Sequence, residues 1–164
     1  MRMSENSYKK MNKLAGECFN ANAIIDNLAY SLEFHYFSEI AKIVHLRVAH
    51  VMPEWADLVT DKMLELSARP KREDINGYGE DYSELPAIFD TLYTTLRELL
   101  ESTRDLISIA DINEDDEVRI FAEGFLERIS VFVKQAEEWK NAAAVLDAQS
   151  LNIHIKQYTH FIEV

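Results

Sequence analysis

The fold of this chain is decided by residues 33–65, which read EFHYFSEIAKIVHLRVAHVMPEWADLVTDKMLE. Steps of three and four residues, which follow one face of a helix, connect seven side chains in and just before this stretch: Leu28, Leu32, His35, Glu39, Ile43, Leu46 and His50. Three of the seven are polar groups that can bind a metal. Buried ionisable groups are costly unless they are paired, hydrogen-bonded or bound to a metal. The stripe therefore predicts a metal site on a helix face.

A carboxylate pair follows on the next segment, where Asp61 and Glu65 lie four residues apart and would share one face of a helix. Imidazole together with carboxylate suits iron, manganese or zinc better than calcium or magnesium. The candidate metal ligands are His35, His45, Asp61 and Glu65, with Glu39 and His50 as second choices. Because His45 and His50 are five residues apart, an α-helix would not point both in the same direction. One of these two is therefore expected to be a surface residue.

Each candidate also has a purely structural interpretation. His35 would then be a hydrogen-bonded core or interface histidine, and Glu39 would pair with a nearby basic side chain. Asp61 and Glu65 would form a solvated acidic face. It is the combination of imidazoles and carboxylates within one stretch that favours a metal site over these readings.

The composition predicts one soluble, folded domain covering residues 1–164. Apolar residues make up 48% of the chain, and only seven residues are Gly or Pro, which favours long regular elements with few turns. No apolar run reaches the length of a membrane span, and the N-terminus lacks the apolar segment of a signal peptide, so a cytoplasmic protein is expected. The single Cys18 excludes an intrachain disulfide framework and a cysteine-rich zinc site.

The formal charge of −12 opposes binding to nucleic-acid phosphates, so general electrostatics disfavours a nucleic-acid partner. The basic cluster before the helical pattern comprises Arg2, Lys9, Lys10 and Lys13. It lies in residues 1–19, which are expected to form an N-terminal arm. This arm would either contact phosphate or be an ordinary solvated end.

The apolar pattern predicts a first helix from near Asn20 or Asn22 to about His50, because asparagine can cap a helix. A second helix would start at Pro53 and end around residues 67–69, where Pro70 stops it. No turn dipeptide separates these two segments. One longer helix with a kink is therefore the alternative.

The turn-rich residues 70–83 predict a long crossover, with or without a short helix of its own. A third helix would follow the cap residue Ser83 and carry an apolar stripe through Leu106, and a fourth would run over residues 118–146. The chain is therefore predicted to be an all-α four-helix bundle with a long crossover between helices two and three. The C-terminal tail, residues 148–164, fits either a strand or a short extra helix.

The third and fourth helices carry no candidate ligands on their inward faces, and the sequence contains no Glu-x-x-His motif. A di-iron centre inside one bundle needs carboxylates from all four helices, so this type of site is disfavoured. Two helices rarely complete a coordination sphere alone. The missing ligands would come from a second subunit across a two-fold axis, with His35 and His45 of one chain facing Asp61 and Glu65 of another.

These residues resemble the Dps or mini-ferritin proteins of the ferritin-like superfamily. The resemblance covers most of residues 22–147 and is carried by His35, His45 and the Asp61–Glu65 pair. The crossover after the sequence LSARP supports it, as does the run Gln135, Trp139, Ala143 near the end of the last helix. The sequence departs from the family pattern in having a tyrosine where a tryptophan usually follows the first histidine. The resemblance implies a shell of twelve subunits that oxidises Fe(II), often with peroxide, and stores the product.

A function of a different class also fits the sequence. A non-enzymatic acidic helical bundle could act as a protein-interaction module through its exposed faces. Such a module would bind no metal, would not assemble into a shell and would not oxidise Fe(II).

Overall fold

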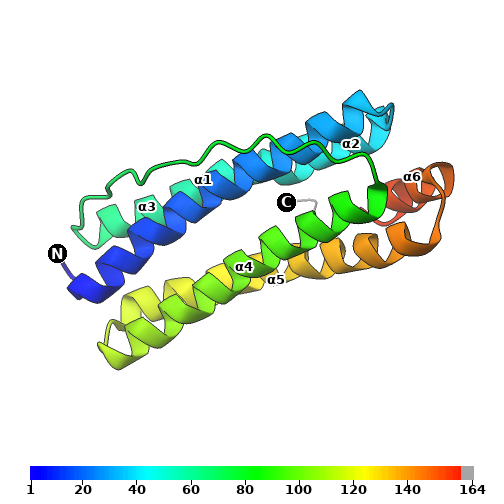
Figure 1. Cartoon of the computed structure of the whole chain (residues 1–164). Helices are drawn as coiled ribbons and strands as arrows, with labels where there is room; N and C mark the ends of the chain where they lie inside the picture. Colours follow the sequence, from blue (N-terminus) through cyan, green and yellow to red (C-terminus); the bar gives the residue numbers. More distant parts are fainter. Residues whose placement is uncertain (160–164) are drawn as a thin grey trace.

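The computed structural model describes residues 1–159, so the last part of the expected tail, residues 160–164, lies outside the described residues. The helical segments in residues 1–159 are α1 (Glu5–Phe34), α2 (Ser38–Val44), the π-helical turn η1 (His45–Ala49), α3 (Val51–Glu65), α4 (Leu85–Ile112), α5 (Asp116–Val145) and α6 (Ala148–Gln157). Figure 1 shows α1, the continuous α2–η1–α3 rod, α4 and α5 lying alongside one another, with α6 at one end. The predicted all-α four-helix bundle is confirmed.

The first helix begins much earlier than expected. Residues 5–19 are part of α1, so the predicted N-terminal arm is wrong. Ser4 provides the cap, because its side chain accepts a hydrogen bond from the Ser7 N–H, and Glu5 adds a favourable negative charge to the first turn. The early helix also has a buried stripe of its own, made by Met11, Leu14, Ala15 and Cys18. The stripe is hard to recognise in the sequence because Lys9, Lys10 and Lys13 lie within the same segment.

The first helix also ends earlier than expected, at Phe34 instead of about His50. Tyr36 has a φ of 69°, a left-handed conformation that is uncommon for a residue other than glycine. The turn is closed by backbone hydrogen bonds, including one of 2.8 Å from Phe37 N to Leu32 O. Without a Gly or Pro to mark it, this turn was not visible in the sequence. As a result, His35 lies between helices and does not share one with His45.

Pro53 does not separate two helices. From Ser38 to Glu65 the chain is one helical rod that contains the π-turn, so the alternative of a longer, irregular helix describes this segment. Pro53 lacks the N–H that would bond to the carbonyl of Ala49, four residues earlier. The side-chain amide of Asn22 on α1 donates to that carbonyl instead, at 2.9 Å. The proline is thereby accommodated inside the rod.

The crossover of residues 66–84 connects α3 to α4 and has no helix of its own. It runs along α1, where Arg72 stacks over the ring of Phe19 with 3.9 Å between the guanidinium carbon and the ring centroid. Gly16 permits this close approach, because a Cβ at that position would lie 2.8 Å from the Cβ of Glu73. The predicted crossover between the second and third helices is confirmed.

The third and fourth helices follow the predicted apolar stripes. The fully buried core of these two helices includes Phe89, Leu92, Leu96, Leu106, Val118, Ala122, Ile129, Ala136 and Trp139. The ring of Trp55 on α3 contacts Phe132 edge-on, with ring centroids 4.7 Å apart, and so joins the two halves of the bundle.

The C-terminal tail was expected to form either a strand or a short helix. Residues 148–157 form a helix, α6 (Ala148–Gln157). The Asp147 side chain caps α6 by accepting from the Ser150 N–H at 2.8 Å. Leu151 and Ile155 bury the inner face of α6 against the end of the bundle. Among residues 1–159, no helix is both long enough and apolar enough to span a membrane.

Candidate metal-binding face

The buried interior formed by residues 1–159 contains no carboxylate or imidazole that could bind a metal. The buried polar residues of this part of the chain are Ser7, Asn12, Ser31, Thr95, Ser102, Thr103, Gln135 and Thr159. None is a carboxylate or an imidazole. An intramolecular di-iron centre, which needs both inside the bundle, is therefore not built by these residues.

His35 lies in the turn between α1 and α2, with about a quarter of its side chain exposed. Its Nε2 is 3.4 Å from Oδ1 of Asp81, on the crossover, and its ring meets Phe34 edge-on. The contact with Asp81 gives His35 a structural role, because it ties the helical turn to the crossover.

His45 begins the π-turn on the second rod, and its Nδ1 lies 2.8 Å from Oδ1 of Asp26 on α1. The π-turn also brings His50 against it, with ring centroids 4.3 Å apart. The expectation that these two side chains diverge is wrong. In a π-turn the repeating hydrogen bond spans five residues, here from His50 N to His45 O at 3.1 Å, so residues five apart face the same way.

Asp26 is the residue that sequence reasoning missed. It precedes the turn at 35–37 by about as many residues as His45 follows it, so an antiparallel helical hairpin places the two side chains together. Asn22 and Ala49 are paired by the same symmetry. Locating the turn would have revealed both contacts, but Tyr36 carries none of the usual turn chemistry.

Asp61 and Glu65 lie near the other end of the second rod. They line a groove of about 690 Å³ between α3 and α5, together with Leu58, Phe121 and Arg128. Glu65 pairs with Lys62 at 2.6 Å, one helical turn away. The two carboxylates are exposed and share one face, as predicted.

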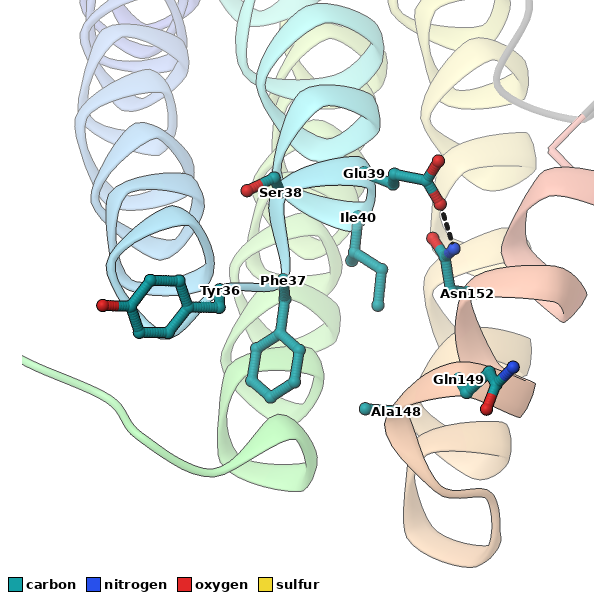
Figure 2. A pocket seen from close by; sticks show the side chains of 8 residues that line it. All are labelled: Tyr36, Phe37, Ser38, Glu39, Ile40, Ala148, Gln149 and Asn152. Carbon is teal, nitrogen blue, oxygen red and sulfur yellow. Dashed lines mark hydrogen bonds between the residues drawn. The ribbon is translucent and has the colours of Figure 1, made fainter.

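Glu39 is engaged elsewhere. It pairs with Lys156 of α6 at 2.6 Å and accepts a hydrogen bond from Asn152. Figure 2 shows the contact between Glu39 and Asn152, both of which line a pocket of about 320 Å³ between the start of α2 and α6. Hydrogen bonds from Lys156 and Asn152 lower the pKa of Glu39. Its contacts serve to hold α6 in place.

No group of three or more His, Cys, Asp or Glu side chains in residues 1–159 is arranged to hold a metal ion. The candidate imidazoles and carboxylates are instead far apart: His35 lies in the turn just before the second rod and His45 in its first half, whereas Asp61 and Glu65 lie in its last turns. On the rod itself, His50 and Asp61 are both exposed. At 3.6 residues per turn, His50 and Asp61 differ in direction by only about 20° and lie about 16 Å apart along the axis.

No protein-family model matches the sequence, and a search of curated proteins found no similar sequence. The structure, in contrast, is similar to a crystal structure described as a ferritin from M. penetrans. The TM-score is 0.87, and the match covers 94% of this chain and 96% of that chain at 10% sequence identity. This comparison establishes a ferritin-like fold.

Proposed function

From this ferritin-like fold, we propose that the protein binds and oxidises Fe(II) and stores or detoxifies iron, in the manner of the Dps or mini-ferritin proteins. The ligands would be His35 and His45 of one subunit with Asp61 and Glu65 of another. The observation that carries this proposal is that the candidate imidazoles lie at or near one end of the α2–η1–α3 rod and the carboxylates near its other end. The solved ferritin of similar structure supports the choice of iron as the metal.

Two-fold symmetry explains why the separation matters. An axis perpendicular to the second rod, passing near its Trp55, would reverse the rod end for end. The histidine end of one chain would then lie over the carboxylate end of its partner. Each pair of chains would thereby complete two sites, although neither chain holds one alone.

Exposed apolar groups beside His45 support a partner surface there. Tyr30 is 61% exposed and lines a groove with His45, and Phe34, one turn further along α1, is 74% exposed. Large exposed aromatic side chains that share a helix face are typical of protein–protein interfaces. Pairing through this face alone closes at two chains, so a shell would need further interfaces between such pairs. Twelve chains of 19.0 kDa would have a mass of about 228 kDa.

The chemistry follows from the donor set. Anionic carboxylates stabilise Fe(III) relative to Fe(II), and positions left open on the iron admit the oxidant. Two Fe(II) ions give one electron each to hydrogen peroxide, which with two protons leaves as two water molecules. The negative surface would attract further Fe(II) towards the sites.

The proposal is tested by solution mass together with Fe(II) oxidation. The expected results are a mass near that of twelve chains, and oxidation that is lost in His45→Ala and Asp61→Ala while both variants remain folded. A monomer across micromolar concentrations would contradict the shared site.

The alternative of an acidic protein-interaction module is favoured by the ion pairs that already engage two candidate ligands, Lys62 with Glu65 and Lys156 with Glu39. In that case the protein would bind no metal and oxidise no Fe(II), and the substitutions of His45 and Asp61 would change neither measurement. Measurements of metal content after purification without chelator distinguish the two functions.

A further inference from the structure

His45 and His50 form an imidazole pair within one chain, on the surface of the second rod. His45 is about one-third exposed and His50 is exposed. Their ring centroids are 4.3 Å apart and their planes are inclined by 64°. Two accessible imidazoles at this separation can converge on one cation after a small rotation of the exposed His50 ring.

Asp26 gives His45 the orientation of a metal ligand. Nδ1 of His45 lies 2.8 Å from the Asp26 carboxylate, which fixes the ring proton on Nδ1. The lone pair of Nε2 is then available to bind a metal ion. Metal-binding histidines nearly always have such a carboxylate or carbonyl partner on the other ring nitrogen. His35 has a similar carboxylate neighbour, Asp81, but within the described part of the chain no second imidazole lies beside it.

The π-turn that creates the pair is fixed by the surrounding structure. Ala49, inside the turn, has its carbonyl bonded to Asn22, and Pro53 follows where an ordinary helical hydrogen bond is missing. π-turns are rare and are frequently found at functional sites. Here the turn has a definite consequence, because it aligns two side chains that an α-helix would direct apart.

We propose that His45 and His50 form a binding site for one transition-metal cation of the Zn²⁺, Ni²⁺ or Cu²⁺ type, with Asp26 as the orienting residue. The remaining coordination positions are filled by water. Neutral imidazoles prefer these ions to Mg²⁺, Ca²⁺ or Mn²⁺. The site goes beyond the proposed iron chemistry, because it needs no second chain and no carboxylate from α3, although both share His45.

Calorimetric titration of the full-length protein with Zn²⁺ and with Ni²⁺, after removal of bound metal, tests the site. One high-affinity ion per chain is expected, and His50→Ala should abolish its binding. Asp26→Asn should weaken binding by about 10- to 100-fold, the usual effect of losing an orienting partner. His154→Ala is the matched control, since His154 on α6 contacts Tyr158, just after that helix, and has no imidazole beside it among residues 1–159. This variant should bind as the wild type does.

Copper provides a readout that a merely structural role would not produce. The electron paramagnetic resonance spectrum of one equivalent of Cu²⁺ should show coupling to two nitrogens in the wild type and to one or none in His50→Ala. Unchanged Zn²⁺ binding and an unchanged spectrum in folded His50→Ala would overturn the proposal.

Asp61→Ala separates this site from the iron site. It should stop Fe(II) oxidation and leave Zn²⁺ binding at His45 and His50 intact. Loss of Zn²⁺ binding in Asp61→Ala would show that the imidazole pair is not an independent site.

Discussion

At the scale of single residues, Asp115 closes one end of the bundle. Its carboxylate accepts hydrogen bonds from the Ser4 N–H, the Ser4 hydroxyl and the Ser7 hydroxyl, and so ties the start of α1 to the link between α4 and α5. Burial raises the pKa of Asp115, but the hydrogen bonds from Ser4 and Ser7 together lower it by more than burial raises it. The pKa of Asp115 therefore lies below its ordinary value. The ionised form is therefore the one that stabilises the fold.

The pH dependence of this contribution has a definite sign. Because the pKa of Asp115 is lower in the folded chain, its stabilisation is complete above the ordinary pKa of 3.8 and is lost as the pH falls through the folded value. Asp115→Asn should cost about 1 kcal/mol of unfolding free energy at pH 6. The difference from wild type should shrink below about pH 4, as the wild-type carboxylate becomes protonated. Urea unfolding at several pH values measures this, and an equal difference at pH 3 and pH 6 would contradict it.

At the scale of elements, the π-turn η1 depends on a contact between α1 and the α2–η1–α3 rod. Asn22→Ala leaves the carbonyl of Ala49 without its side-chain donor, and we expect a loss of about 1–2 kcal/mol. Pro53→Ala restores a backbone N–H that can reach the same carbonyl. The cost of Asn22→Ala should therefore be smaller when Pro53→Ala is also present, and a double-mutant cycle of unfolding free energies measures the coupling. Strictly additive effects would mean that the amide does not compensate for the proline.

The crossover provides a second test at this scale, with an internal control. Gly16→Ala places a Cβ 2.8 Å from Glu73, so the crossover must shift, and a net loss of about 1 kcal/mol is expected. Gly124→Ala on α5 meets nothing within 4 Å and should stabilise the helix by about 0.5–1 kcal/mol. Thermal midpoints of both variants, with limited proteolysis of the crossover, check the opposite signs. Stabilisation by both substitutions would show that the crossover is not held against α1.

At the scale of the whole molecule, the apolar periodicity was sufficient to predict the bundle and its crossover. It failed where the chain breaks local rules. Tyr36 turns the chain in a left-handed conformation without glycine, and Pro53 sits inside a helix because Asn22 replaces its missing hydrogen bond. The turn at Tyr36 is closed by local backbone hydrogen bonds that carry no residue signature, and the accommodation of Pro53 depends on a tertiary contact that a single sequence does not display.

The same limit applied to the candidate site. The shared face of Asp61 and Glu65 was predictable from their spacing, whereas the partner of His45 was not, because Asp26 lies on another helix. The proximity of His45 and His50 needed knowledge of a π-turn, which sequence periodicity does not show.

If one iron site takes ligands from two chains, mixing two inactive variants should restore activity. His45→Ala and Asp61→Ala would each be inactive alone, and they would be unfolded together, refolded as an equimolar mixture and assayed for Fe(II) oxidation. In a mixed pair of chains, one site loses both ligands and the other keeps both. The account therefore predicts recovery of about a quarter of wild-type activity with random two-fold pairing. A mixture that assembles to the wild-type mass and remains inactive would contradict it.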